Sequence, residues 1–308
     1  MDMNIMLGIP AVAVILSALV YWMTPRLGEK LRSLRIVGRD VHKLKRPEVP
    51  EMGGIMILAA LSVMLAFSYA ATGSQSILMC LYAVAAFGIY GILDDILKLG
   101  KYQKLALSTG IAAGLVLLAG PPAALAVLLV FLTLGIGNIF NLFAGFNGLE
   151  VGCTWLISLF FSAICFLTGN IIPFYLSFGF FLVLVGFLVH NKYPARIFPG
   201  NVGTMTMGGF FAGICLYFGT YSLLIPLLFL HIADVALKAA SAGYFSSSEK
   251  TPTRVNGYNI LVPGDDYLSL TRLVLRLRPM TERQLVYFFW GLFSVVGFAT
   301  VFATGVLL

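Results

Sequence analysis

The stretch Asn138-Ile-Phe-Asn-Leu-Phe-Ala-Gly-Phe-Asn-Gly-Leu-Glu150 joins two long apolar segments of this chain. It places three asparagines, two glycines and a glutamate within thirteen positions. Polar side chains at the edge of a membrane span are costly and are usually retained for a function. If the flanking segments cross a membrane, the stretch therefore predicts a binding site for a polar ligand at the membrane boundary.

The composition of the whole chain is that of a membrane protein. Of its 308 residues, 59% are hydrophobic and only 11% are charged, whereas soluble domains carry nearer 25% charged residues. Crossing a hydrocarbon core takes roughly 20 apolar residues. The four cysteines lie in apolar segments without paired spacing and indicate neither zinc nor disulfides. Ten apolar segments are expected to span the membrane, at residues 5–24, 53–71, 76–93, 104–120, 122–138, 151–168, 171–190, 204–220, 221–240 and 284–308.

The basic residues all fall on one side of this predicted bundle. The 20 lysines and arginines lie in alternate connections or, in the case of Lys238, at the end of the segment before the last loop. The positive-inside rule then places these loops in the cytoplasm and both termini outside. We predict an all-α polytopic membrane protein with a single domain over residues 1–308 and about ten transmembrane helices. Its cytoplasmic loops are expected at about 25–52, 94–104, 139–150, 191–203 and 241–283.

The last loop contains two candidate elements. Residues 253–260 place Asn256-Gly257 between strand-like flanks, which predicts a β-hairpin. Residues 267–278 mix leucine and valine with three arginines, which suits an interfacial helix on the membrane surface. The alternation between Leu273 and Arg278 also suits a strand.

Asp94 and Asp95 follow the third apolar segment. Two adjacent carboxylates at a membrane boundary repel each other unless a cation lies close. On a helix their side chains point about 100° apart, so that one can face a metal and the other a substrate proton. A solvated helix end is the alternative interpretation.

The asparagines of the first stretch have two possible uses. Asn138 and Asn141 lie three residues apart, on one face of a helix, where amide oxygens can bind a hard cation or the edge of a base. Asn147, beside Gly148, also suits a simple turn.

A second glycine-containing stretch precedes the eighth apolar segment. Gly200 and Gly203 at the start of a predicted helix favour an anion-binding backbone, and an ordinary loop capped by Thr204 is the alternative. The basic residues Lys238, Lys250 and Arg254 are candidates for phosphate binding, or are positive-inside anchors. The three histidines do not cluster, and we expect no histidine metal site.

Six motifs recur in order along the chain: Gly38-Arg-Asp40-Val-His-Lys43, Pro50-Glu-Met-Gly-Gly54, Asp94-Asp95 with Lys104, the stretch from Asn138 to Glu150, Tyr193-Pro-x-Arg196-x-Phe198-x-Gly200 and Pro279-Met-Thr-Glu-Arg283. Taken together, these motifs resemble the polyprenyl-phosphate N-acetylhexosamine-1-phosphate transferase family over nearly the whole chain. The Ala-Gly-Phe-Asn-Gly-Leu-Glu sequence is closer to the eukaryotic and archaeal branch, which starts N-glycan assembly on dolichyl phosphate. The absence of histidine from residues 241–283 separates the chain from the bacterial peptidoglycan enzymes.

The resemblance implies roles for individual residues. It makes Asp94 and Asp95 the acidic pair of the active site and Lys104 a phosphate-binding residue. The uracil would contact Asn147 and Phe198, with Asn138 close to the substrate. The loop of Lys250 and Arg254 would hold the diphosphate and the sugar, and Asn141 and Asn201 would bind magnesium.

Asn201 departs from the family pattern, in which an aspartate follows Phe-x-Gly. An amide keeps an oxygen ligand but loses the negative charge. We therefore expect weaker metal binding unless another carboxylate compensates.

The family resemblance implies a Mg²⁺-dependent enzyme of the cell membrane, with Mn²⁺ as the expected substitute. It would transfer N-acetylglucosamine 1-phosphate from UDP-GlcNAc to a polyprenyl (dolichyl) phosphate on the cytoplasmic face, release UMP, and start N-glycan or cell-surface glycan assembly. Alternatives are another UDP-N-acetylhexosamine, undecaprenyl phosphate as acceptor, or a non-enzymatic transporter of an anionic metabolite. A homodimer is compatible with the family, and no nucleic-acid partner is expected.

Overall fold

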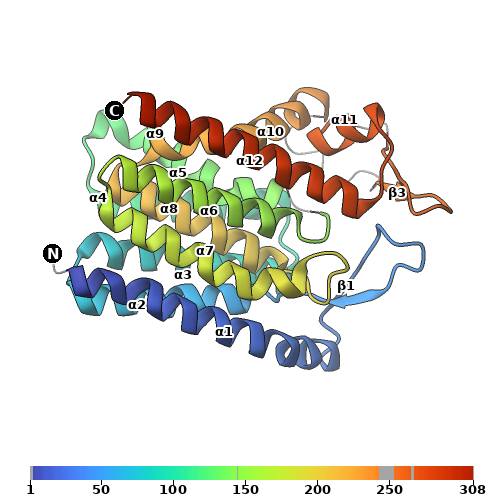
Figure 1. Cartoon of the computed structure of the whole chain (residues 1–308), viewed down its shortest axis with the longest axis horizontal. Helices are drawn as coiled ribbons and strands as arrows, with labels where there is room; N and C mark the ends of the chain where they lie inside the picture. Colours follow the sequence, from blue (N-terminus) through green and yellow to red (C-terminus); the bar gives the residue numbers. More distant parts are fainter. Residues whose placement is uncertain (1–2, 144, 243–252, 265–266, 308) are drawn as a thin grey trace.

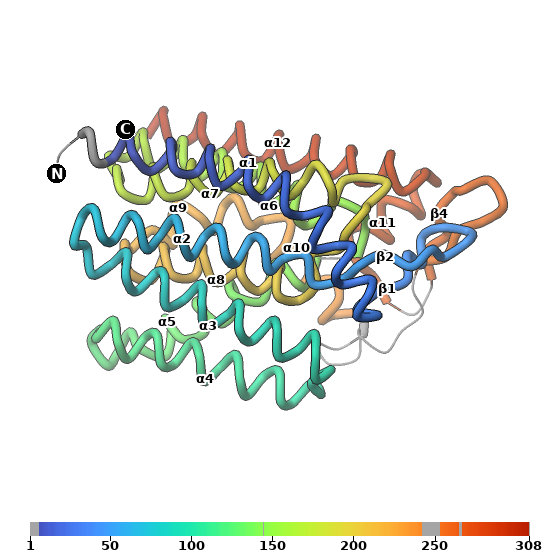
Figure 2. The backbone as a smooth tube through the Cα atoms, turned by 90° about the horizontal axis from the view of Figure 1, so that it is seen from below, coloured from blue at the N-terminus to red at the C-terminus, as the bar shows by residue number. Residues whose placement is uncertain are grey.

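A computed structural model describes residues 3–143, 145–242, 253–264 and 267–307. The long helices run side by side along the longest axis of the molecule (Figure 1), and the second view shows the same arrangement (Figure 2). The predicted all-α class is confirmed. The long helices are α1 Met3–Ser33, α2 Ile55–Thr72, α3 Gln75–Leu97, α4 Lys101–Ala119, α5 Ala123–Leu142, α6 Leu149–Leu167, α7 Ile171–Asn191, α8 Gly200–Phe218 and α12 Glu282–Leu307. The shorter helices are α9 Tyr221–Leu224, η1 Ile225–Leu228, α10 Phe229–Ala242 and α11 Leu270–Leu277.

Nine helical segments of the described residues are long and apolar enough to cross a membrane, with α9, η1 and α10 counted as one segment. Helix α8 is not among them, because glycine, threonine and asparagine dilute its apolar residues. It is instead the central helix of the bundle in both views, and its residues 202–215 are all buried. With α8 included, the bundle has the ten predicted spans, and both termini lie at the same end (Figure 1).

Small residues allow the neighbours of α8 to approach closely. A Cβ atom at Gly208 would lie 2.1 Å from the carbonyl oxygen of Gly137 on α5, and one at Gly209 would lie 2.9 Å from the carbonyl oxygen of Ala83 on α3. Backbones that come this close are typical of helix packing in membranes, where shape rather than hydrophobicity drives association. The centre of the bundle therefore has no room for larger side chains.

The predicted loop 25–52 is wrong over its first nine residues, because α1 continues to Ser33 through Pro25. Leu31 is still buried there. The charged residues of this segment mark the place where the helix leaves the apolar layer, not the place where it ends. The rest of the loop forms a hairpin that was not predicted, in which strand β1 Val37–Arg39 pairs antiparallel with β2 Glu48–Pro50.

The hairpin predicted in the last loop is confirmed, and so is the helical form of the segment that follows it. Strand β3 Arg254–Val255 pairs antiparallel with β4 Leu261–Val262, and the side chain of Asn256 closes the turn by accepting hydrogen bonds from the N–H groups of Tyr258 and Ile260 (both 3.0 Å). Residues 270–277 form helix α11 rather than a strand. The hydroxyl of Ser269 caps this helix by accepting a hydrogen bond from the Arg272 N–H (3.2 Å).

The hairpins and α11 gather at the end of the bundle opposite to the termini (Figure 1). There the segment after β2 is joined to the segment before α8. The Phe198 N–H donates to the Pro50 carbonyl (2.8 Å), and the Gly54 N–H donates to the Pro199 carbonyl (2.9 Å). Gly54 is required at this contact, because a Cβ atom would lie 2.1 Å from the Cα atom of Gly203.

Candidate active site

A cavity of about 200 Å³ lies at this loop end, between the β1–β2 hairpin, the α5–α6 connection and the first turn of α8. Its lining brings together four residues that the sequence singled out: Asn141, Asn147, Phe198 and Asn201. The lining also contains three carboxylates and a further amide for which no role was predicted: Asp40, Glu51, Glu150 and Asn191. The cavity is therefore rich in oxygen ligands and hydrogen-bonding groups.

The N-terminus of α8 binds an anion, as the glycine spacing predicted, but that anion belongs to the protein. The Asp95 carboxylate accepts hydrogen bonds from the backbone N–H groups of Asn201 (2.9 Å) and Val202 (3.0 Å). Such a carboxylate at a helix N-terminus is stabilised by the peptide dipoles. Gly200 has a positive φ of 67°, and a Cβ atom there would lie 2.6 Å from Asp95 Oδ2. Asp95 thus fixes the helix start that presents Asn201 to the cavity.

Asp94 points to a different element, as expected from its position on α3. Its carboxylate is buried and lies 2.8 Å from Lys104 Nζ on α4. The adjacent carboxylates are thus separated, one facing a lysine and the other the start of α8. Neither aspartate, nor Lys104, lines the cavity described above.

Two polar atoms in the wall of the cavity lack a partner in the described part of the chain. They are Glu150 Oε2 and Asn191 Oδ1, which are both buried. Close to them, Asn141 Oδ1 accepts a hydrogen bond from Thr204 on α8 (3.0 Å). A buried carboxylate oxygen without a partner is costly, and a hard cation with oxygen ligands would satisfy it. The residues present therefore fit a magnesium ion. Glu150 also provides a carboxylate in the cavity that Asn201 lines.

Asn147 belongs to a buried network that joins the first and last parts of the chain. Its side-chain Nδ2 donates to Asp40 Oδ2 (2.9 Å), and its backbone N–H donates to Glu282 Oε1 (2.8 Å). Lys43 Nζ lies 3.2 Å from Asp40 Oδ2 and also pairs with Glu282 Oε2. Asp40 and Lys43 occur in one resemblance motif and Glu282 in another, but no spacing rule connects them, because Lys43 and Glu282 are 239 positions apart.

His42 lies beside this network and stacks on Phe146, with 4.3 Å between the ring centres. Burial lowers the pKa of His42 to about 4, an effect that Asp40 opposes and Lys43 reinforces. The side chains of Asp40, His42 and Glu282 offer ligand atoms within 4.8 Å of one another. The ammonium of Lys43 already contacts both carboxylates, however, so this group already contains a cation.

A second cavity, of about 240 Å³, shares the wall of Val41, His42, Gly145 and Phe146 with the first. Its far side is lined by Asp234, Lys238 and the buried Arg272. Each cavity alone is smaller than the roughly 300 Å³ at which small-molecule pockets begin. An elongated ligand that occupied both would lie across His42 and Phe146.

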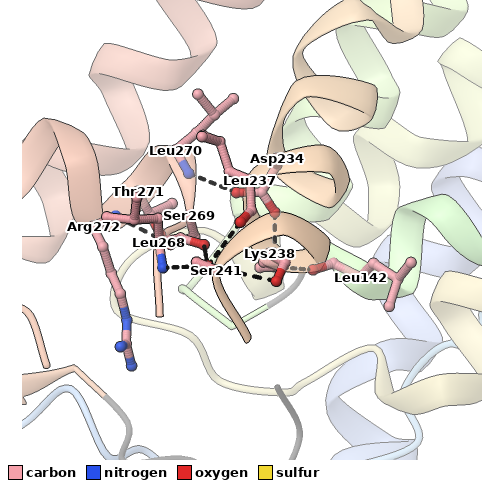
Figure 3. A network of polar contacts seen from close by, with 10 residues as sticks. All are labelled: Leu142, Asp234, Leu237, Lys238, Ser241, Leu268, Ser269, Leu270, Thr271 and Arg272. Atoms are coloured by element: carbon pink, nitrogen blue, oxygen red, sulfur yellow. Dashed lines mark hydrogen bonds and ion pairs between the residues drawn. The ribbon is translucent and has the colours of Figure 1, made fainter. Parts of the chain in front are cut away.

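Figure 3 shows how the far wall of the second cavity is built. Lys238 Nζ lies 2.7 Å from Asp234 Oδ2 and donates to the carbonyl of Leu142 at the end of α5 (2.5 Å). The other oxygen of Asp234 accepts a hydrogen bond from the Leu270 N–H (2.7 Å). This network joins α10 and α11 to the helix that carries Asn141.

Comparison with known proteins agrees with the resemblance read from the motifs. Residues 76–219 match the model of glycosyl transferase family 4. A Methanocaldococcus jannaschii protein that is named a glycosyltransferase is 34% identical over 268 residues, which cover 84% of this chain and 86% of that protein. The chain belongs to glycosyl transferase family 4.

Further relatives carry more specific names. A Sulfolobus acidocaldarius protein named a UDP-N-acetylglucosamine–dolichyl-phosphate N-acetylglucosaminephosphotransferase is 28% identical over 303 residues, 87% of this chain and 88% of that protein. A phospho-N-acetylmuramoyl-pentapeptide-transferase of Clostridium botulinum is 33% identical over 211 residues, 60% of this chain and 64% of that protein. This family 4 member is thus similar to transferases from both archaea and bacteria.

Some predicted residues of this family 4 transferase lie away from the cavities. The Asn138 side chain donates to the Leu134 carbonyl of its own helix (2.8 Å) and lines neither cavity. Arg254 is exposed on β3 and also lines neither cavity. Lys250 lies outside the described residues. Arg272 and Lys238 are therefore the basic residues of the described chain that line the second cavity.

Proposed function

We propose that this transferase moves N-acetylglucosamine 1-phosphate from UDP-GlcNAc to a polyprenyl phosphate of the dolichyl type on the cytoplasmic side of the cell membrane, releasing UMP. The observation that carries the proposal is the cavity at the loop end, where Asn141, Asn147, Phe198 and Asn201 come together from two separate parts of the chain. Membership of family 4 and the names of the relatives support the reaction type.

The nucleoside would occupy the first cavity. An aromatic ring, Phe198, and a carboxamide, Asn147, line it together, which supplies a stacking surface and a hydrogen-bonding group for a base. The diphosphate and the sugar would extend across His42 and Phe146 into the second cavity, where Lys238 and Arg272 supply positive charge. Cationic side chains suit phosphate oxygens.

Magnesium would be held by Asn141, Asn201 and Glu150, whose side chains line one cavity. Once bound, the ion would neutralise charge on the diphosphate and on the leaving UMP. Glu150 would then replace the negative charge that Asn201 lacks. Manganese, which also accepts oxygen ligands, is the expected substitute.

The acidic pair would position other groups rather than remove a proton from the acceptor phosphate. The second pKa of a phosphate monoester is about 6, so its last proton is mostly absent near neutral pH and a general base contributes little. Because both oxygens of Asp95 accept backbone hydrogen bonds, we assign it to holding the α8 N-terminus. Asp94 would position Lys104 for phosphate binding.

The pH profile of Asp94→Asn and Asp95→Asn tests these roles. If the pair only positions groups, each variant loses activity by a similar factor from pH 6 to pH 9. Recovery of activity at alkaline pH would instead identify the altered aspartate as a general base.

The decisive assay for the reaction uses purified protein, UDP-GlcNAc and dolichyl phosphate, with and without Mg²⁺, and measures UMP release. Glu150→Gln should raise the Mg²⁺ concentration needed for half-maximal rate about tenfold or more, whereas exposed Glu48→Gln should not. Competition with other UDP-N-acetylhexosamines, and undecaprenyl phosphate as acceptor, determines the substrates. Absence of Mg²⁺-dependent UMP release with every UDP-sugar would refute the proposal.

A further inference from the structure

The carboxamide of Asn147 is held by charged residues from two distant parts of the chain. Nδ2 donates to Asp40 Oδ2 (2.9 Å), and Lys43 binds the same carboxylate oxygen (3.2 Å) as well as Glu282. Asp40, Asn147 and Glu282 are each no more than 4% exposed, and the Lys43 side chain is 18% exposed. These contacts are protected from water and are therefore strong.

The chemistry of Asp40 decides which end of the carboxamide faces it. An aspartate paired with lysine is a carboxylate, and a carboxylate only accepts hydrogen bonds. The NH₂ group of Asn147 must therefore face Asp40, because the opposite rotamer would place two oxygens in contact. Many amide orientations are ambiguous, but this one is determined by its partner.

The oxygen of the carboxamide is left for a ligand. Asn147 Oδ1 accepts no hydrogen bond from the described residues, and it is absent from the buried polar atoms that lack a partner. Asn147 also lines the first cavity. The side chain thus offers a bound molecule a hydrogen-bond acceptor in a fixed orientation.

We propose that Asp40, held by Lys43, which Glu282 binds in turn, is a positioning residue that determines base specificity. It fixes the Asn147 oxygen toward the nucleotide, so that the site selects a base with a ring N–H donor. Uracil has such an N–H at N3, whereas cytosine has a bare nitrogen acceptor at that position. The inference rests on the proposed function, because it requires a nucleotide in the first cavity.

Asp40→Asn is the most direct test of this positioning role. Asparagine has the same shape but both donates and accepts, so that either rotamer of Asn147 becomes possible. Glu282→Gln acts less directly on Asp40, by removing the charge that holds Lys43, while a glutamine oxygen can still accept the hydrogen bond from the Asn147 backbone N–H. Glu48→Gln on β2 is the matched control, because Glu48 is exposed and lies outside both cavities.

The measurement is direct titration of purified protein with UDP, with CDP and with UDP methylated at N3. The unaltered chain should bind UDP at least about 30-fold more tightly than either analogue, because each leaves the oxygen unpaired. Asp40→Asn should reduce the preference for UDP over CDP to within about threefold. Glu282→Gln should reduce it by a smaller factor, and Glu48→Gln should leave it unchanged.

The ratio of two affinities separates specificity from folding, because a general loss of structure weakens both nucleotides equally. An unaltered chain that binds CDP within threefold of UDP overturns the inference. A folded Asp40→Asn protein that keeps the 30-fold preference also overturns it. If that variant does not fold, an undiminished preference in Glu282→Gln has the same meaning.

These outcomes differ from failure of the proposed function. If the chain releases UMP from a UDP-sugar but the variants keep the preference for UDP over CDP, only the positioning role of Asp40 is refuted. A chain that binds no uridine nucleotide and releases no UMP refutes both.

Discussion

The centre of the bundle and its loop end are held together by different forces. Around α8, glycines place backbones in contact, and the neighbouring side chains are apolar. At the loop end, the described residues form four ion pairs: one within the β1–β2 loop, one within α10, one between the consecutive helices α3 and α4, and one, Lys43–Glu282, between distant parts of the chain. The packing of the first region depends on the volume of its side chains, and the structure of the second depends on the pairing of opposite charges. Volume changes and charge changes should therefore damage different properties of the protein.

This division also separates folding from chemistry. The central helix positions Asn201 and Thr204 at its first turn, so errors in packing would displace the site as a whole. The charged network positions single groups, such as the carboxamide of Asn147. Four substitutions test this difference between the two regions.

Gly208→Leu should have the largest effect. A side chain at this position would meet the backbone of α5 at Gly137, and overpacking a rigid contact of this kind costs about 3 kcal/mol or more. We expect little folded protein on size-exclusion chromatography in detergent. Gly114→Leu on α4 is the control, because nothing lies within 4 Å of a Cβ atom there; equal yields of the two variants would contradict the packing argument.

Glu282→Gln should have an intermediate effect on stability. Among the described residues, the change leaves Lys43 with Asp40 as its only acidic partner, and weakening a buried pair in this way costs about 2 kcal/mol. Thermal unfolding measured against exposed Glu48→Gln gives the difference. If Glu282→Gln were as stable as its control, the network would not hold the loop end together.

The charge state of His42 should make stability depend on pH. Its pKa is lowered from 6.5 to about 4, so the unfolded chain takes up a proton between these values while the folded chain does not. Stability is therefore lost as the pH falls below about 6.5, by about 1 kcal/mol between pH 7 and pH 5.5. The loss should be smaller in His42→Gln when thermal unfolding is followed at both pH values, and an equal loss in the two proteins would exclude His42 as its source.

Arg254→Ala should have the smallest effect. The side chain is exposed on β3 and lines neither cavity, so we expect less than about a threefold change in the rate of UMP release, as for most surface substitutions. Asn147→Ala provides the contrast, with a loss of tenfold or more in UDP affinity. A large loss in Arg254→Ala would show that β3 moves toward the substrate.

The sequence predicted the spans and the motif residues because hydropathy and local spacing report them directly. The motifs single out Asn141, Asn147, Phe198 and Asn201, and the structure brings all four to one cavity. The divergence of Asp94 and Asp95 also followed from the helical repeat. The resemblance places Arg254 at the site, whereas the structure leaves its side chain exposed on β3 and outside both cavities.

The contacts that cross the chain could not be predicted in the same way. Nothing local indicates that Lys43 would meet Glu282, or that the anion at the start of α8 would be Asp95. Helix α1 extends beyond its predicted end because charge density locates the edge of the membrane, whereas helix length depends on capping and packing. The proposed role of Glu150 has a local signal, since this carboxylate lies two positions after Gly148 of the Asn-Gly motif.

The burial of α8 has a consequence for topology mapping. A hydropathy threshold finds nine crossings, and an odd number would put the two ends of the polypeptide on opposite faces. When the buried helix α8 is counted, the number of crossings is even, and the two ends of the polypeptide lie on the same face. Reporter fusions after Gly100, after Gly219 and at the C-terminus distinguish the two counts. With ten crossings, the reporters after Gly219 and at the C-terminus lie on one face of the membrane and the reporter after Gly100 lies on the other. With nine crossings, all three lie on the same face.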